Sequence, residues 1–210
     1  MTDDVTMASY GASVDCMSRL VLASASSRRR DLLFQIGMTA DVVVPANIEE
    51  VPHRGELPAK LARRLSLAKA NKIAVDYADA FVLGADTVVA CGRRILPKAE
   101  SESEAHSCLI MLSGRRHRVY GGVTIVSPEG IKRTRVVKTV VSFKLLAKKE
   151  IDNYVASGEW QGKAGGYAIQ GLAASFIRFI SGSYTNVVGL PLFEVAQLLT
   201  GLGYKCETHK

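Results

Sequence analysis

The sequence predicts an α/β fold with a mixed central sheet between helices. Short apolar runs typical of buried strands alternate along the chain with segments of helical periodicity. The runs Val119–Val126 and Ile131–Phe143 flank the turn Pro128-Glu129-Gly130, which predicts one β-hairpin and therefore antiparallel pairs within the sheet. With 210 residues, 48% of them hydrophobic, the chain is long enough to bury a substantial core.

The first half of the chain is predicted to contribute three strands and two helices. In chain order these are a strand at Arg19–Ala23, a helix from Arg28, a strand at Asp41–Pro45, a helix from Pro58 to about Ala78, and a strand at Phe81–Ala85 that resumes at Val88–Ala90. The hydroxyl groups of Ser24–Ser27 can cap the first helix, and Gly37 is expected to end it. Pro58 suits a first helical turn, and Leu61 and Leu65 follow at helical spacing.

The second half is predicted to contain the hairpin and three helices. The helices are expected at Ser101–Leu112, Ala147–Ala156 and Leu192–Leu199. Before the last helix lie two segments rich in glycine and polar residues, Lys163–Gly171 and Gly182–Leu192. Because glycine lets a backbone approach a ligand closely, we interpret these segments as parts of a binding site. A pair of glycine-rich hairpins without a ligand is the alternative.

Composition limits the class of partner. There are 27 basic and 20 acidic residues, and the net charge of +7 favours polyanions such as nucleic acid, a membrane surface or phosphorylated small molecules. The four cysteines are widely spaced and lack zinc spacing, which favours reduced thiols and a cytoplasmic location. Residues 1–18 show neither a secretory signal nor a membrane span, and we expect a flexible arm followed by a single domain over residues 19–210.

A phosphate-binding motif is predicted at the first junction between a strand and a helix. Ser24-Ala25-Ser26-Ser27 is followed there by Arg28 and Arg29. Free amides at a helix N-terminus attract anions, and guanidinium groups bind phosphate oxygens in a bidentate manner. A solvated basic turn is the alternative interpretation.

Two carboxylates and two lysines complete the candidate chemistry. Asp86 follows an apolar strand and is expected at its end, where a carboxylate can bind a metal or act as a general base. Glu50 is expected on a loop, and it becomes a candidate because a Mg²⁺ ion near a triphosphate would need a second carboxylate ligand. Lys69 and Lys98 are individually ordinary surface lysines, but with Arg28 and Arg29 they would supply about four positive charges for a triphosphate.

Several motifs in the same order resemble the Maf family of nucleoside triphosphate pyrophosphatases. They are Leu22–Arg29, Gly84–Thr87, Leu112–Gly114, Lys163–Gly171 and Gly182–Leu192, and the resemblance covers roughly residues 19–204. It implies an inosine-triphosphatase-like structure with a cleft between two lobes, a homodimer, and hydrolysis between the α and β phosphorus atoms with Mg²⁺ or Mn²⁺.

The resemblance also assigns roles to individual residues. Ser24, Arg28 and Arg29 would bind phosphate, and Lys69 and Lys98 would neutralise it. Glu50 and Asp86 would hold the metal, with Asp86 as the catalytic base.

The substrate branch is indicated by Asp86-Thr87 and Ile169-Gln170-Gly171, which match the dTTP and UTP branch. Here Thr87 and Gln170 become substrate-binding candidates, because the Gln170 carboxamide offers the donor and acceptor that a pyrimidine edge requires. The sequence departs from the family pattern at Ser27, at Ala99 and at Gly121, where proline, proline and threonine are usual. The first two departures remove no charge, but the third leaves the role of its segment open.

We therefore predict a cytoplasmic pyrophosphatase for dTTP, UTP and modified pyrimidine nucleotides that cleanses the nucleotide pool. The alternatives are 7-methyl-GTP or ITP as substrate on the same scaffold, or a basic nucleic-acid-binding protein linked to cell division. The candidate basic residues converge with acids on loops and form no stripe with exposed aromatic residues, which disfavours nucleic acid. No membrane partner is expected.

Overall fold

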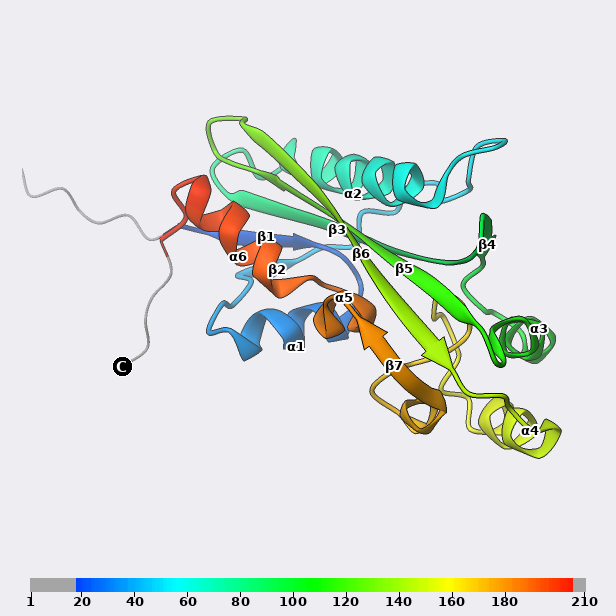
Figure 1. The fold of residues 1–210 in the computed structure, drawn as a ribbon. Helices are drawn as coiled ribbons and strands as arrows, with labels where there is room; N and C mark the ends of the chain where they lie inside the picture. The colour runs from blue at the N-terminus through cyan, green and yellow to red at the C-terminus, as the bar shows by residue number, and fades with distance from the viewer. Residues whose placement is uncertain (1–17, 206–210) are drawn as a thin grey trace, which may run out of the picture.

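The computed structural model describes residues 18–205, which form one seven-stranded mixed sheet with helices on both faces (Figure 1). The strands are β1 (Leu20–Ala23), β2 (Val42–Val43), β3 (Phe81–Cys91), β4 (Arg94–Leu96), β5 (Arg116–Val126), β6 (Lys132–Phe143) and β7 (Ile177–Ser181). The helices are α1 (Ser27–Gln35), α2 (Pro58–Ala74), α3 (Glu102–Leu112), α4 (Lys148–Ala156), α5 (Tyr184–Val188) and α6 (Leu192–Gly201), with a 3₁₀ turn η1 at Leu172–Phe176. This architecture confirms the predicted fold class.

The predicted flexible arm, residues 1–18, lies outside the described residues except for Ser18. The Ser18 hydroxyl accepts a hydrogen bond from the amide of Lys205, 3.1 Å away. Within the described chain, no helix combines the length and the apolar character needed to span a bilayer.

The strands follow the order β2-β1-β3-β5-β6-β7, and β4 also pairs with β3. Strand β1 runs parallel to β2 and β3, whereas the other pairs are antiparallel. The predicted strand at Asp41–Pro45 is reduced to the two residues of β2. Pro45 has no N–H to donate, and the chain then leaves the sheet toward α2.

Alternation along the strands divides the core between the two faces of the sheet. Val21 of β1 and Val82 of β3 pack with Ile73 of α2 on one face. On the other face, Leu22 and Leu83 belong to the large core that includes residues of α1 and α6. Since successive residues of a strand point to opposite faces, each buried strand is apolar on both sides.

Two glycines let α2 pack directly on the backbone of the sheet. A Cβ atom added to Gly84 would lie 2.4 Å from the carbonyl oxygen of Ser66, and one added to Gly122 would lie 2.1 Å from that of Ala62. Neither position tolerates a side chain, because the atoms it would meet belong to the helix backbone. This close packing brings Lys69 of α2 next to β3.

The long strands β3, β5 and β6 connect two groups of helices. Helices α1, α2 and α6 lie toward one end of these strands, and α3 and α4 lie at the other (Figure 1). The predicted helical face of α3 is confirmed, because four of its residues are buried: Ala105, Cys108, Leu109 and Leu112. Four elements are absent from the prediction: β4, η1, β7 and α5. Of these, η1 and β7 lie between the two glycine-rich segments, and α5 lies within Gly182–Leu192.

Candidate active site

A pocket of about 500 Å³ opens where one edge of β3 lacks a neighbouring strand. On that edge β1 pairs with residues 81–84 and β4 pairs with residues 89–91, so residues 85–88 have no strand partner there. Because side chains alternate between faces, Asp86 and Thr87 point to opposite sides of this gap. Asp86 was predicted at the end of a strand. That prediction is wrong, because Asp86 lies in the middle of the 11-residue strand β3. The gap places a mid-strand carboxylate beside the pocket.

The start of α1 forms one wall of the pocket. Ser24, Arg28 and Arg29 line it, as predicted. The serines do not cap the helix through their side chains: Ser26 is the N-cap residue and makes no such bond. The Ser24 hydroxyl instead accepts hydrogen bonds from the Ser26 amide at 3.2 Å and from Arg29 at 2.8 Å. Ser26, Ser27 and Arg28 also line the pocket, so the N-terminus of α1 borders it, as anion binding requires.

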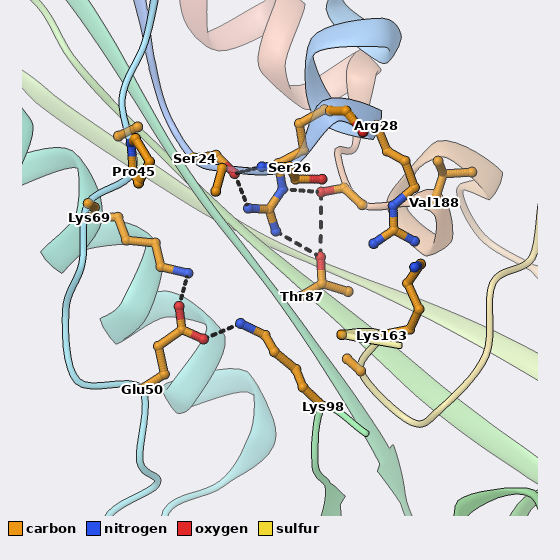
Figure 2. A pocket seen from close by; sticks show the side chains of 18 of the residues that line it. Ser24, Ser26, Arg28, Pro45, Glu50, Lys69, Thr87, Lys98, Lys163 and Val188 are labelled. Carbon is orange, nitrogen blue, oxygen red and sulfur yellow. Dashed lines mark hydrogen bonds and ion pairs between the residues drawn. The ribbon is translucent and has the colours of Figure 1, made fainter. Parts of the chain in front are cut away.

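The Arg29 side chain forms hydrogen bonds to three separate segments that line the pocket. Besides Ser24, its guanidinium donates to the Gly189 carbonyl at 3.0 Å and to the Thr87 hydroxyl at 3.3 Å (Figure 2). Thr87 also donates to the Gly189 carbonyl at 3.4 Å. Burial lowers the pKa of Arg29, although the nearby Asp86 carboxylate opposes this effect. Three of its five N–H groups are occupied, so two are left for a ligand.

Lys69 joins the two candidate acids. Its Nζ atom lies 2.6 Å from Oδ1 of Asp86 and 2.6 Å from Oε1 of Glu50. The second oxygen of Glu50 accepts from Lys98 (Figure 2). Lys69 is only 7% exposed, which corrects its interpretation as a surface lysine when considered alone. Glu50, whose side chain is 33% exposed, is held in the site rather than free in solvent.

The pKa of Glu50 follows from these contacts. Burial alone would raise it, but the hydrogen bonds from Lys69 and Lys98 outweigh burial and hold it below its ordinary value. Glu50 is thus ionised at neutral pH, and the site holds a pair of carboxylate groups whose charges are balanced by two ammonium groups.

Lys98 and Lys163 reach the pocket on adjoining backbones. Lys98 forms an isolated antiparallel bridge with Ala164, and the amide of Ala99 donates to the carbonyl of Lys163 at 3.2 Å. Gly165, with φ +71, donates to the carbonyl of Pro97 at 2.9 Å. The glycine-rich segment thus positions Lys163, which belongs to a predicted motif but was not among the predicted site residues.

The same segment continues into a buried aromatic cluster. Tyr167 lines the pocket, and its hydroxyl lies 2.8 Å from Nε2 of His117. The rings of Phe143 and His117 contact Tyr167 edge to face. Burial lowers the pKa of His117 to about 4, so the imidazole is neutral at physiological pH. This buried cluster packs behind the part of the pocket wall that contains Tyr167.

Gln170 is the one predicted substrate-binding residue that the structure does not bring to the pocket. Its side chain is exposed and is not among the lining residues. The other candidates converge: Ser24, Arg28, Arg29, Glu50, Lys69, Thr87 and Lys98 line the pocket, and Asp86 lies beside it, bonded to Lys69. Asn186 belongs to the segment Gly182–Leu192 that was interpreted as part of a binding site. Its hydrogen bonds anchor α5, and the carbonyl of the C-cap residue Gly189 accepts from Arg29.

The pocket combines a helix N-terminus, five basic side chains and two carboxylates within an α/β fold. This combination defines the class: a protein that binds a phosphorylated small molecule and can perform acid–base chemistry on it. Comparison with known proteins identifies the family. The model of the Maf-like protein family matches residues 19–202, and the chain belongs to that family.

Relatives of high identity cover nearly the whole chain. A dTTP/UTP pyrophosphatase of Paramagnetospirillum magneticum is 60% identical over 90% of this chain and 99% of the relative. Proteins of the same name from Mesorhizobium japonicum and Caulobacter vibrioides are 56% and 58% identical, over 94% and 96% of their lengths. Among solved structures, a HAM1 protein from Coxiella burnetii shares 12% identity at a TM-score of 0.47, covering 88% of this chain and all of that one.

Proposed function

We propose that this protein hydrolyses dTTP and UTP to the monophosphate and pyrophosphate. The observation that carries the proposal is the pair of carboxylates, Glu50 and Asp86, converging on Lys69 at one side of a basic pocket. Relatives at 56–60% identity bear the name of this activity. We propose that the protein also acts on modified pyrimidine nucleotides and so cleanses the nucleotide pool.

Asp86 is proposed as the general base. Its carboxylate is 3% exposed and has one oxygen bonded to Lys69, which holds its orientation. The other oxygen has no hydrogen-bond partner within residues 18–205, so it can accept a proton from a water molecule. Attack of that water on the α-phosphorus releases pyrophosphate. The nearby cations stabilise the negative charge on the phosphate oxygens during this step.

A divalent cation fits the two carboxylates. Their oxygens converge on the Nζ atom of Lys69, and carboxylate oxygens are what Mg²⁺ and Mn²⁺ prefer. No group of three or more His, Cys, Asp or Glu residues capable of holding a metal occurs in the described chain, so substrate oxygens would complete the coordination. Glu50 and Asp86 would hold the cation, which would polarise the α-phosphate when bound.

Four further residues are proposed to bind the substrate around this centre. Ser24 and Arg29 face the phosphates from the start of α1, and Thr87 fixes Arg29 beside the base. Lys98 would bind phosphate once the substrate competes for it with Glu50. Base recognition by Gln170 stays a prediction of the resemblance. The ratio of kcat/KM for UTP to that for 7-methyl-GTP in Gln170→Glu tests it, and a fall in that ratio supports it.

Product analysis tests the reaction. UTP and dTTP should yield UMP and dTMP with pyrophosphate, which ion-exchange chromatography separates from diphosphate and orthophosphate. Accumulation of UDP and orthophosphate would place attack at the γ-phosphorus and refute the proposal. A panel that includes 7-methyl-GTP and ITP decides between the substrate branches.

The proposal also covers the assembly and the location of the protein. We propose a homodimer, which sedimentation equilibrium tests. We also propose a cytoplasmic location, which the free thiols of Cys91 and Cys108 support because widely spaced unpaired cysteines suit a reducing compartment.

A further inference from the structure

We propose that Arg28 and Lys163 form the subsite for the leaving pyrophosphate, which fixes the direction in which the triphosphate lies in the pocket. This inference rests on the proposed function for the position of the α-phosphate. It adds Lys163 as a substrate-binding residue.

The cationic side chains on the two sides of the pocket differ in whether carboxylates compensate their charge. On one side, Lys69 and Lys98 are paired with Glu50 and Asp86, so the ammonium charges there are compensated. On the other side stand Arg28 and Lys163, whose charged ends point toward one another (Figure 2). The five cations of the pocket are thus unevenly balanced, and the excess positive charge is concentrated at the Arg28 side.

Neither member of this cation pair has a carboxylate partner in the described part of the chain. Arg28 makes no side-chain hydrogen bond or ion pair within residues 18–205, and Lys163 donates only to the carbonyl of Gln161, at 2.9 Å. The Glu159 carboxylate would by itself raise the pKa of Lys163, but it forms no ion pair with it in the described residues, and it accepts from the amide of Leu172 at 2.8 Å. Two like charges are therefore held face to face without an anion.

The effect of this proximity is visible at Lys163. Burial lowers the pKa of Arg28, and burial together with the charge of Arg28 lowers the pKa of Lys163. An anionic group placed between them would relieve the repulsion and favour the charged forms. The first amides of α1, adjacent to Arg28, add further donors on the same side.

Charge also decides which part of the substrate occupies this side. If the α-phosphate lies beside Asp86 for attack, the remaining substrate consists of a neutral nucleoside and a strongly anionic pyrophosphate. Only the pyrophosphate has the negative charge that complements these two cations. A neutral base in its place would leave both cations without a counter-charge. Lys163 and Arg28 therefore stabilise the charge that develops on the leaving group as the bond to the α-phosphorus breaks.

Calorimetric titration of the full chain with inorganic pyrophosphate, and separately with UMP, tests this assignment. Both titrations are run without divalent metal, so that only protein groups contribute. The variants are Lys163→Met and Arg28→Met, which keep the aliphatic stem of the side chain and remove its charge. The matched control is Lys149→Met, an exposed lysine on α4 outside the pocket. Thermal unfolding checks that each variant is folded.

We expect the Kd for pyrophosphate to rise at least about 10-fold in each pocket variant, in line with loss of one charged hydrogen bond. The Kd for UMP should change less than about 2-fold, and Lys149→Met should bind both as the parent does. An unchanged Kd for pyrophosphate in both pocket variants overturns the subsite. Weaker UMP binding with unchanged pyrophosphate binding overturns the orientation. Product analysis of the parent enzyme is independent of these outcomes, so failure of the subsite and failure of the proposed reaction are distinguished.

Discussion

The Nζ atom of Lys69 lies 2.6 Å from Oδ1 of Asp86, and both side chains are buried. An ion pair removed from water in this way needs both partners, because a single buried charge is costly. Gly84 and Gly122 make the pair possible by letting α2 approach β3. The candidate base is thus held by the same packing that joins helix to sheet.

Replacing Asp86 with Asn should lower kcat for UTP by roughly 10²- to 10⁴-fold, the usual contribution of a general base. The amide keeps the shape of the carboxylate and can still accept from Lys69, so the protein should remain folded. Steady-state hydrolysis measures the loss, and circular dichroism provides the control. Turnover equal to that of the parent would remove Asp86 as the base.

Replacing Lys69 with Met should reduce the free energy of unfolding by about 3–5 kcal/mol, because the Asp86 carboxylate loses its buried partner. The double variant Lys69→Met/Asp86→Asn removes the stranded charge and should be more stable than Lys69→Met alone. Urea unfolding at pH 7 compares them. If the double variant is no more stable than the single one, the pair does not determine stability here.

Substitutions at Gly121 and Asn186 should have coupled effects on the free energy of unfolding. A Cβ atom on Gly121 would lie 1.9 Å from Oδ1 of Asn186, while Nδ2 of Asn186 donates to Val119, Val137 and Thr139 at 3.0–3.3 Å. Gly121 is in β5 and has no positive φ, so threonine, usual here in the family, meets a side chain and not backbone strain.

Gly121→Thr alone should therefore cost about 1–3 kcal/mol of stability through overpacking. In combination with Asn186→Ala, which vacates the space, the cost should be smaller than the sum of the two single costs. A double-mutant cycle by urea unfolding measures the coupling. Strictly additive costs would show that the two positions are independent.

Acid should destabilise the protein through His117. Its pKa is about 4 in the folded protein and about 6.5 when unfolded, so the unfolded chain binds more protons between these values. Stability should therefore fall as pH drops from 6.5 to 4, by about 3 kcal/mol at the low end. His117→Gln, which cannot titrate, should lose this part of the pH dependence. Urea midpoints at pH 7.5 and 4.5 provide the comparison, and parallel losses in parent and variant would exclude His117.

The sequence by itself determined much of the fold, because apolar periodicity and turn residues act locally. The hairpin around Pro128-Glu129-Gly130 and the buried face of α3 followed directly from such patterns. Strand β7 and helix α5 did not, because β7 is partly exposed and α5 has only five residues. Such elements depend on partners distant in the sequence: the hydrogen bonds of Asn186 reach residues 47 to 67 positions away.

The same division holds for the site. Residue types and their order were sufficient to select Asp86, Glu50, Arg28 and Arg29, because each belongs to a short stretch of sequence that can be interpreted without knowing the fold. Only the tertiary structure decided how their charges are distributed. Glu50 pairs with Lys98, 48 positions away, and Lys163 faces Arg28 without an ion-pair partner among residues 18–205. Pairing depends on distance and burial after folding, and therefore the charge balance of the pocket is a property of the tertiary structure alone.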